Sequence, residues 1–579
     1  MKKLMLGNEA VSRGAFEAGV TVATAYPGTP STEITEYLSS YPEIDSEWSV
    51  NEKVALEIGI GASIAGARAL VCMKHVGLNV AMDPLMSISY PGVNGGLVIV
   101  VADDPGQHSS QNEQDTRYFG IAAKVPVLEP SDSQECKDFV IKAFELSEQF
   151  DTPVILRLST RVSHSQSVVE LGERQQIPLK DFQSTEGKYI VAPGYARKRR
   201  VVAEKRLEEL CDYAETTDLN VVQESDRPVG VITSGIAFQY AREALPEAGF
   251  LKLGLSYPLP RKKIEEFASK FKKLYVVEEL EPIFETIIKS WGVKVIGKEK
   301  LPAIGELDVS TIREALTGRR LSETPLSLGY QLPQRPPVLC PGCHHRGPFY
   351  VLKKLKLRVS GDIGCYTLAA FPPFSSMHTS ICMGASIGMA FGFEKARGKS
   401  FAGESVAVIG DSTFWHSGVT GLIDVVYNKG FTTVIILDNA VTAMTGHQEN
   451  PSTGRTLHGT ETVQLDFEAL ARSIGIRRVT DVDAYDLDAL ERVIREEVAA
   501  KEPSVIITRK PCILKKGATS IRKEPCEVLI EKCKACRKCI ALGCPAIYWK
   551  ENKAFIDSTL CTGCELCKSV CRFGAITSK

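Results

Sequence analysis

The sequence predicts a multidomain α/β protein that ends in a small cysteine-rich domain. Its 579 residues suffice for three or four domains. Along most of the chain, short apolar runs alternate with helix-like stretches, a pattern typical of parallel sheets covered by helices. Eight of the 17 cysteines lie between Cys533 and Cys571. With 44% hydrophobic and 24% charged residues, the composition excludes disorder as the main state.

Charge and hydropathy exclude several classes of function. The 69 basic and 70 acidic residues give a formal charge of −1, which offers no bulk attraction to nucleic acid or to a membrane surface. The apolar run after Met1 stops at Gly7-Asn8-Glu9, and no stretch approaches the roughly 20 apolar residues that span a bilayer. We therefore expect a reducing, cytoplasmic environment, in which cysteines are thiols or metal ligands.

The first α/β unit is expected over residues 1–165, followed by a connector over 166–228. Apolar runs in this unit predict four buried parallel strands, at Val20–Ala25, Ala69–Met73, Leu97–Ala102 and Val154–Leu158. In the connector, apolar runs no longer alternate with helix-like stretches. It carries the basic run Ala196–Arg200, which favours a solvated helix start over a nucleic-acid patch.

A smaller α/β unit is expected over 229–322, then a proline-marked linker over 323–337 that includes Pro325. The predicted strands of the smaller unit are Val229–Ser234, Leu274–Val277 and Val293–Ile296. A third α/β unit is expected over 338–515, with predicted strands at Ser405–Ile409, Thr433–Leu437 and Ser504–Thr508. The cysteine-rich domain is expected over 526–579.

Cysteine spacing in the last domain predicts two iron–sulfur clusters. Each half of the domain carries three cysteines at x2 spacing and a fourth further on. Three such thiolates can hold three corners of one cube, while the fourth crosses to the other cube. One cluster is assigned to Cys533, Cys536, Cys539 and Cys571, and the second to Cys544, Cys561, Cys564 and Cys567. Two structural zinc sites are the alternative, because CxxC pairs also suit tetrahedral zinc.

The last domain resembles bacterial-type two-cluster ferredoxins over residues 526–579. It departs from them in two places: four residues rather than three precede Cys544, and no proline follows Cys571. It holds nine Lys/Arg and five Asp/Glu residues, so its net charge is +4 (nine minus five). This basic surface is expected to steer an acidic soluble ferredoxin, unless the excess only offsets the charge of the clusters.

Polar residues follow two predicted strands of the third unit. Gly410-Asp411-Ser412 comes after one strand, and Asp438-Asn439 comes after the next. Ligands in α/β sheets bind outside the carboxyl ends of strands, and Mg²⁺ takes carboxylate, amide and carbonyl oxygens together with phosphate oxygens. The pattern resembles the diphosphate signature of thiamine diphosphate enzymes, which implies that Asp411, Asn439 and the carbonyl of Val441 hold Mg²⁺. Ser412 stands where that signature commonly has glycine.

Two further segments resemble loops that line the thiamine diphosphate site of 2-oxoacid:ferredoxin oxidoreductases. They are CPGCHHR at 340–346 and DIGCY at 362–366, and residues 442–448 similarly resemble the family's metal loop. The resemblance implies cofactor contacts from Cys340, Gly342, Cys343, His344, Gly364, Cys365, Tyr366, Gly410, Asp411, Ser412, Asn439, Thr445 and Gly446. A zinc site is the alternative for Cys340, Cys343, His344 and His345, although adjacent histidines do not easily turn to one tetrahedral ion.

The helix that begins near Glu52 is expected to carry the acid that activates this cofactor. Thiamine diphosphate needs a carboxylate hydrogen-bonded to N1′ of its aminopyrimidine, and Asn51–Ala55 resembles the pyrimidine-binding segment of the superfamily. Glu52 is therefore the candidate, and Glu57 on the same helix is the second choice. Without the other motifs, Glu52 would be interpreted as a first-turn glutamate favoured by the helix dipole.

Three further residues of the first unit are candidates for the substrate site. In the resembling enzymes, a threonine at the position of Thr29 faces the 2-oxoacid, and the loop that contains His75 belongs to the active site. Arg117 is expected to bind the carboxylate of the 2-oxoacid, because a fixed guanidinium matches a carboxylate bidentately. A surface arginine paired with Asp115 is the alternative.

Over residues 1–579, the chain resembles the alpha subunit of aryl-pyruvate-oxidising members of the 2-oxoacid:ferredoxin oxidoreductase family. The motifs are YPGTPSTE at 26–33, MKHVGLN at 73–79 and the two loops above, with the two-cluster domain attached. The resemblance implies two parallel α/β domains of the thiamine-diphosphate-binding type, a smaller α/β domain between them, and a C-terminal two-cluster ferredoxin-like domain.

The same resemblance implies a reaction and its partners. Aryl pyruvates (indolepyruvate or phenylpyruvate-like acids), coenzyme A and oxidised ferredoxin would give an aryl-acetyl-CoA, CO₂ and reduced ferredoxin. The enzyme would be assembled with a small beta subunit, as alpha2beta2. Two other functions stay open: a non-oxidative 2-oxoacid decarboxylase, against which the cysteine-rich domain argues, and a non-catalytic iron–sulfur electron-transfer subunit.

Overall fold

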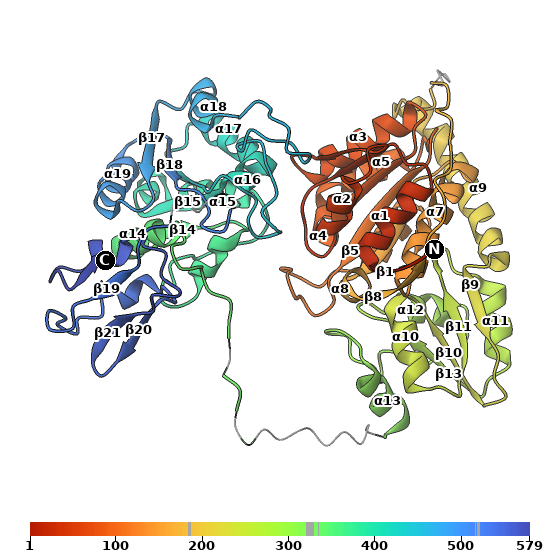
Figure 1. The fold of residues 1–579 in the computed structure, drawn as a ribbon. Coiled ribbons are helices and arrows are strands. Elements are labelled where there is room, and N and C mark those ends of the chain that lie inside the picture. The colour runs from red at the N-terminus through yellow and green to blue at the C-terminus, as the bar shows by residue number, and fades with distance from the viewer. Residues whose placement is uncertain are drawn as a thin grey trace. The chain divides into compact units, whose positions relative to one another are not determined.

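The computed structural model describes residues 1–182, 187–319, 329, 331–333, 335–515, 517 and 522–578. The chain forms two compact units, Met1–Ser327 and Leu328–Lys579, each of which is described by itself (Figure 1). Most of the linker expected over 323–337, Pro325 included, lies outside the described residues. Within these residues, no helix is long and apolar enough to cross a membrane.

A seven-stranded sheet organises the first unit. Its strands are parallel, except that the edge strand β12 pairs antiparallel with β6. Fully buried Val and Ile residues dominate the central strands, as expected for a sheet covered on both faces. The spatial order is β12 (Leu255–Tyr257), β6 (Val127–Leu128), β7 (Val154–Ser159), β5 (Leu97–Asp103), β4 (Ala69–Lys74), β2 (Val22–Ala25) and β3 (Asp45–Trp48).

Helices cover both faces of this sheet because side chains along each strand point alternately to either side. One core contains Val98 and Val100 of β5 and is closed by α1 (Gly7–Glu17), α2 (Thr32–Leu38), α7 (Ser133–Gln149) and α8 (Thr160–His164). The opposite core contains Ile99 and Val101 and is closed by α3 (Glu52–Ile64), α4 (His75–Val80), α5 (Met82–Ile88) and α6 (Arg117–Ala123).

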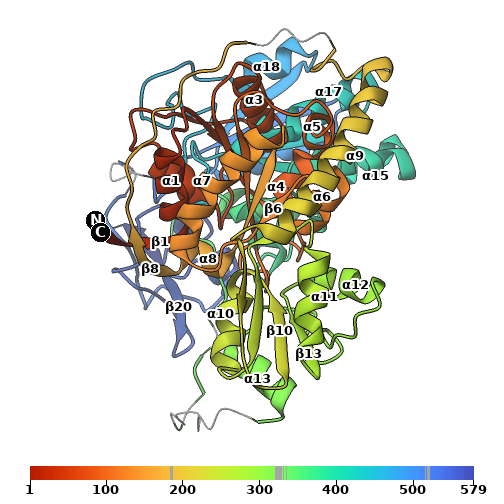
Figure 2. The same cartoon turned by 90° about the vertical axis from the view of Figure 1, so that its right-hand side faces the viewer.

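The connector and the smaller sheet complete the first unit. Strand β8 (Gln166–Glu170) pairs with β1 (Lys2–Leu6), and the 24-residue helix α9 (Pro193–Thr216) follows, so the basic run Ala196–Arg200 lies near a helix start as expected. The smaller sheet has the order β13 (Lys273–Val277), β10 (Val229–Thr233), β11 (Gly249–Leu253) and β9 (Asn220–Gln223). Figure 2 shows α10 (Gly235–Ala244) and α11 (Arg261–Ser269) on opposite sides of it; α12 (Ile283–Ser290) and α13 (Val309–Thr317) complete the two cores.

A five-stranded parallel sheet organises the second unit. Its order is β14 (Arg358–Ser360), β15 (Ser405–Gly410), β16 (Thr433–Asp438), β18 (Ser504–Arg509) and β17 (Arg478–Asp483). One face packs against α14 (Arg346–Leu355) and α19 (Leu487–Ala499), and the other against α15 (Ala385–Arg397), α17 (Val419–Tyr427) and α18 (Phe467–Ser473). Short helical turns fill the loops: Cys365–Ala370, Lys399–Glu404, Asp411–Thr413 and Phe414–Gly418.

The cysteine-rich domain packs on the α14 side of this sheet. Its cysteines Cys526, Cys533, Cys539 and Cys567 belong to the same apolar core as Val406 and Ile435 of the sheet. Its elements are the pair β19 (Cys526–Val528) and β22 (Ile576–Ser578), the hairpin β20 (Ile547–Lys550) and β21 (Lys553–Ile556), the turn Ile540–Leu542 and the helix α20 (Leu566–Ser569). The domain is thus built into the second unit.

All but one of the predicted strands are present, with ends shifted by up to two residues. The exception is Val293–Ile296, where only Ile296 forms an isolated bridge, to Tyr275. This apolar run closes one core through Val295 without extending the sheet, so the prediction of a strand there is wrong.

Candidate functional site

Asp411 and Asn439 lie at the carboxyl edge of the five-stranded sheet, directly after β15 and β16. The main-chain N–H of Val441 donates to Oδ2 of Asp411 at 3.2 Å and to Oδ1 of Asn439 at 3.0 Å, so these two side-chain oxygens lie close together. Burial, and next the charge of Asp438, raise the pKa of Asp411 to about 7. A divalent cation would relieve this cost, and a carboxylate with a carboxamide is a donor set that fits Mg²⁺.

The turn Gly410-Asp411-Ser412, called the GDS turn, is connected to the DIGC loop at 362–366 through Tyr366. The hydroxyl of Tyr366 accepts from the N–H of Gly410 at 2.9 Å and donates to the carbonyl of Ile363 at 3.1 Å. A Cβ on Gly410 would come within 2.9 Å of the Tyr366 ring, so the strand end requires glycine here. Asp362, fully buried, accepts from the main-chain N–H groups of Gly384 and Ser386 and thereby fixes the start of α15.

The CPGC loop reaches the same place through its histidines. The rings of His345 and Tyr366 are 5.5 Å apart, and those of His344 and His345 are 3.9 Å apart. Burial lowers the pKa of His344 to about 3 and that of His345 well below its usual range, so both imidazoles are neutral. Burial, and then the neighbouring thiols of Cys512 and Cys340, raise the pKa of Cys365 to about 11. The two loops and the GDS turn therefore form one buried polar group of residues.

The zinc alternative for this loop meets three ligand atoms rather than four. The ligand atoms of Cys343, His344 and His345 lie within 4.8 Å of one another, and Sγ of Cys343 is 3.4 Å from Nδ1 of His345. Cys340 does not belong to this group as far as the described residues show. A closed structural zinc site has four protein ligands, so the arrangement departs from one.

The loop after Asn439 folds back on itself at Thr445 and Gly446. Thr442 and Gln448 form an antiparallel bridge, and Oγ1 of Thr445 donates to Oε1 of Gln448 at 2.6 Å. Gly446 has φ +128°, a conformation that side-chain-bearing residues rarely adopt. The loop is therefore ordered by its own contacts beside Asn439.

Glu52 begins α3 in the first unit, where Asn51 caps the helix by accepting from the N–H of Val54 at 2.9 Å. Glu52 is 4% exposed, and a Cβ on Gly77 would come within 2.6 Å of its Oε1. Glu57, the second choice, is exposed and forms an ion pair with Lys53. Burial therefore separates the two candidates in favour of Glu52.

Thr29 and His75 lie with Glu52 at the carboxyl edge of the seven-stranded sheet. Thr29 follows β2, and its carbonyl accepts from Oγ of Ser109 at 3.2 Å. His75 follows β4 and is fully buried; its Nε2 is 3.1 Å from Oδ1 of Asn112, and no described group bonds its Nδ1. Burial lowers the pKa of Lys74, the residue before His75, to about 8. The charges of Asp104 and Glu52 oppose this shift without cancelling it.

Arg117 has a different role from the one predicted. It is 1% exposed, and its guanidinium donates to Asp115 at 2.6 Å, to Glu278 at 2.8 Å and to two carbonyls of the smaller domain. Glu278 follows β13, so the arginine joins α6, which covers the seven-stranded sheet, to the four-stranded sheet. Because its donors are engaged and its side chain is buried, Arg117 is a structural ion-pairing residue, and its prediction as a substrate ligand is wrong. The alternative is right about the pairing with Asp115 and wrong about the surface position.

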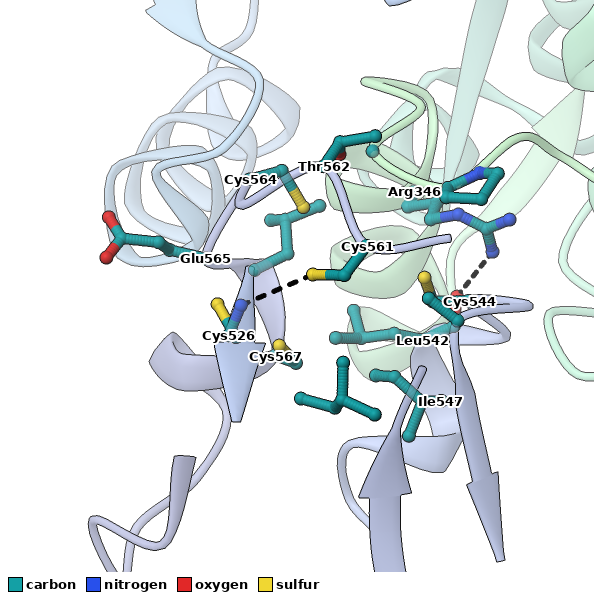
Figure 3. A pocket seen from close by; sticks show the side chains of 15 residues that line it. Arg346, Cys526, Leu542, Cys544, Ile547, Cys561, Thr562, Cys564, Glu565 and Cys567 are labelled. Carbon is teal, nitrogen blue, oxygen red and sulfur yellow. Dashed lines mark hydrogen bonds between the residues drawn. The ribbon is translucent and has the colours of Figure 1, made fainter. Parts of the chain in front are cut away.

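The eight predicted cluster ligands gather in two cavities. One cavity is lined by Cys533, Cys536, Cys539 and Cys571. A second is lined by Cys544, Cys561, Cys564 and Cys567 (Figure 3). In both, the cysteine that is distant in sequence joins three from the other half of the domain, and four thiols around a cavity fit a cubane cluster.

Models of three protein families match the chain. They are the thiamine-diphosphate-binding domain of pyruvate flavodoxin/ferredoxin oxidoreductases over residues 13–214, the C-terminal TPP-binding domain of thiamine pyrophosphate enzymes over 362–508, and the 4Fe-4S binding domain over 554–577. Proteins named indolepyruvate oxidoreductase subunit IorA match nearly the whole chain. The one from Pyrococcus horikoshii is 40% identical over 99% of this chain and 96% of its own length, and the one from Archaeoglobus fulgidus is 40% identical over 99% and 97%.

The chain belongs to the IorA family of indolepyruvate oxidoreductase subunits. This confirms the predicted fold class, with thiamine-diphosphate-binding α/β domains and a C-terminal 4Fe-4S domain, and an enzyme of the 2-oxoacid:ferredoxin oxidoreductase type. A 2-oxoglutarate synthase subunit KorA from Methanothermobacter marburgensis is 26% identical over only 47% of this chain and 86% of its own length. A solved 2-oxoglutarate:ferredoxin oxidoreductase from Magnetococcus marinus covers 54% of this chain and 64% of its own, at 17% identity and a TM-score of 0.45.

The structure of this IorA-family chain also brings residues to these sites that the sequence analysis did not select. Asn450 bonds the side chain of Asp411 and is 3.4 Å from Oγ1 of Thr442. Cys526 lines the second cysteine cavity, and its main-chain N–H donates to Sγ of Cys561 at 3.4 Å (Figure 3). Arg346 lines the same cavity. No spacing rule marks Asn450 or Cys526, whereas Arg346 is part of the CPGCHHR string.

Proposed function

We propose that this chain is the alpha subunit of an enzyme that oxidises aryl pyruvates, indolepyruvate among them. Coenzyme A and oxidised ferredoxin are the co-substrates; an aryl-acetyl-CoA, CO₂ and reduced ferredoxin are the products. The observation that carries this proposal is the 40% identity over 99% of the chain with proteins named as indolepyruvate oxidoreductase subunits. The match to a 2-oxoglutarate synthase subunit is weaker and covers less than half of the chain.

In this proposal, the polar edge of the five-stranded sheet holds the diphosphate end of the cofactor. Asp411, Asn439 and the carbonyl of Val441 would bind Mg²⁺, and the convergence of the two side-chain oxygens on one N–H supports this. The residues proposed to contact the diphosphate are His344, Gly364, Tyr366, Gly410, Ser412, Thr445 and Gly446. When bound, thiamine diphosphate supplies the electron sink for decarboxylation.

The polar edge of the seven-stranded sheet would bind the aminopyrimidine of the cofactor and the 2-oxoacid. The carboxylate of Glu52 is proposed to accept a hydrogen bond at N1′ of the aminopyrimidine, which its burial beside Gly77 supports. Thr29 and His75 are proposed to face the 2-oxoacid. Since Nε2 of His75 is engaged by Asn112, its Nδ1 is the atom proposed to orient the keto acid.

The cysteine-rich domain would carry electrons to ferredoxin through two [4Fe–4S] clusters. The two cysteine cavities support this count, because each collects the four thiols of one predicted cluster. Exposed Lys534 and Arg537 stand beside Cys536 at the first cavity and would attract an acidic carrier. A small beta subunit, in an alpha2beta2 assembly, is proposed as the partner.

The proposal is tested by anaerobic turnover of the complete complex with indolepyruvate, phenylpyruvate, pyruvate and 2-oxoglutarate in parallel. We expect kcat/KM to be highest for the two aryl acids, with CoA-dependent reduction of ferredoxin. A strong preference for pyruvate or 2-oxoglutarate would contradict the aryl assignment and leave the reaction type standing. Release of an aldehyde without ferredoxin reduction would identify a non-oxidative decarboxylase instead.

A further inference from the structure

Arg346 is a buried cation whose partners among the described residues are main-chain carbonyls. It is 2% exposed; its Nε donates to the carbonyl of Cys340 at 3.1 Å, its Nη1 to that of Leu542 at 2.8 Å, and its Nη2 to that of Leu339. Cys340 opens the CPGC loop and Leu339 precedes it, whereas Leu542 belongs to the cysteine-rich domain. The guanidinium therefore bridges the thiamine-diphosphate-binding domain and the electron-carrying domain (Figure 3).

No carboxylate in the described part of the chain forms an ion pair with Arg346. The similarly buried Arg117 and Arg157 each contact at least two carboxylates. A buried guanidinium without a counter-charge is costly, so the protein interior is expected to supply an anion at this position.

The cavity beside Arg346 contains the candidate anion site. It is lined by Cys544, Cys561, Cys564 and Cys567 together with Arg346, Pro341 and Gly342, so the CPGC loop forms one of its walls. A cluster ligated by four thiolates carries net negative charge and becomes one unit more negative on reduction. The other cysteine cavity is lined by exposed cations, Lys534 and Arg537, and by no residue of the CPGC loop.

The main chain is packed so closely beside this cavity at Gly342 and Gly543 that a side chain at either position would clash. A Cβ on Gly342 would come within 2.2 Å of Oγ1 of Thr562, the residue after Cys561. A Cβ on Gly543, the residue before Cys544, would come within 2.7 Å of Pro373 and 3.4 Å of Nη1 of Arg346. Gly543 has φ +61°, and it closes the four-residue spacing that precedes Cys544. The unusual spacing thus presents the Leu542 carbonyl to Arg346.

We propose that Arg346 is the counter-charge of the cluster held by Cys544, Cys561, Cys564 and Cys567, and that it raises the reduction potential of this cluster. The proposal rests on the proposed function of the cysteine-rich domain as a carrier of two [4Fe–4S] clusters. A fixed positive charge in a dry environment stabilises the reduced, more negative state. Arg346 acts through the cluster and is a positioning residue; the cluster beside it is the one that the CPGC loop adjoins.

Redox titration of the anaerobic complete complex, followed by EPR, tests the proposal in Arg346→Gln. We expect the midpoint potential of one cluster to fall by about 59 mV, which is a tenfold weaker reduction equilibrium for one electron, while the other is unchanged. Arg346→Lys keeps the charge and should shift the midpoint by less than half as much. Arg537→Gln, which removes an exposed cation at the other cavity, should leave the Arg346-dependent signal where it is in the wild type.

Two measurements distinguish a failure of the Arg346 proposal from a failure of the two-cluster function on which it rests. Iron analysis should give about eight iron atoms per chain in the wild type; a wild type with about four would contradict the two-cluster function itself. Full iron with both midpoints unshifted in Arg346→Gln would overturn the role of Arg346 alone. If Arg346→Gln lost iron, Arg346→Lys would decide: full iron with a midpoint that falls by less than about 30 mV supports the charge, and a fall of about 59 mV despite the retained charge contradicts it.

Discussion

Gly77 lies so close to Glu52 that a Cβ on Gly77 would come within 2.6 Å of Oε1 of Glu52. The main chain at the start of α4 therefore forms one wall of the space around this carboxylate. We predict that Gly77→Ala displaces the Glu52 side chain and lowers kcat by about 100-fold, because a misplacement of about 1 Å at a reacting group has this effect. Gly61→Ala is the matched control: no atom lies within 4 Å of a Cβ there, so kcat should stay at the wild-type value. Equal activity in both variants would contradict the placement of Glu52.

Glu52 and Glu57 lie on the same helix, but only Glu52 is buried. Glu52→Gln keeps the shape of the side chain and removes the proton acceptor, so we predict a fall in kcat of at least about 100-fold with the EPR signals of the clusters intact. Glu57→Gln removes the same charge from the exposed face and should stay within twofold of the wild type. A large loss in Glu57→Gln with none in Glu52→Gln would reverse the assignment, and full turnover in both variants would favour a non-catalytic subunit.

Cys526 lines the same cavity as four proposed cluster ligands. Replacing it therefore tests whether those four cysteines are the ligands. A cubane cluster needs four thiolates, so Cys526→Ala is expected to keep about eight iron atoms per chain, whereas Cys544→Ala should keep only about four. Iron and acid-labile sulfide analysis of the two anaerobically purified variants measures this. Loss of a cluster in Cys526→Ala with retention in Cys544→Ala would exchange their roles.

Glu279 gives the stability of the first unit a pH dependence. Burial raises the pKa of Glu279 to about 7 from an ordinary value of 4.5, and its Oε1 accepts from the N–H of Leu307 at 3.1 Å. The folded state therefore holds this proton more tightly than the unfolded state, so its contribution to stability is fully present below about pH 4.5 and is lost as the pH rises to about 7.

We predict that the free energy of unfolding of Glu279→Gln, measured relative to that of the wild type, rises by about 3 kcal/mol between pH 4.5 and pH 8. Denaturant unfolding at the two pH values measures this. Glu281→Gln, which changes an exposed glutamate two residues further on, should show no such gain. A pH-independent difference between Glu279→Gln and the wild type would refute the raised pKa.

The parts of this structure that follow local rules could be predicted from the sequence. Buried strands such as Leu97–Asp103 are continuous apolar runs, and polar residues such as Asp411 and Asn439 follow strands that end at the same edge of a sheet. The two cysteine sets were also predicted from spacing, with three thiols at x2 spacing in one site and the fourth cysteine of each run crossing to the other site. The grouping of Cys544 with Cys561 in one cavity agrees with the predicted crossing.

The parts that depend on packing between distant segments could not be predicted. Arg117 resembles a substrate-binding arginine in sequence, yet Glu278, 161 residues away, occupies its guanidinium. Cys526 lies outside every spacing rule and reaches its cavity because β19 pairs with β22. Val293–Ile296 has the apolar composition of a strand but packs into a core without a neighbouring strand to extend. In each case, tertiary contacts override the local pattern.

We propose that the electrons of an oxidised aryl pyruvate leave through the cysteine-rich domain to ferredoxin. The most direct test measures CO₂ release and ferredoxin reduction together, in the anaerobic complete complex supplied with indolepyruvate, coenzyme A and oxidised ferredoxin. We expect two electrons in ferredoxin for each CO₂ released, and loss of ferredoxin reduction in Cys544→Ala. CO₂ release at an undiminished rate without ferredoxin reduction, in the wild-type complex, would contradict the account.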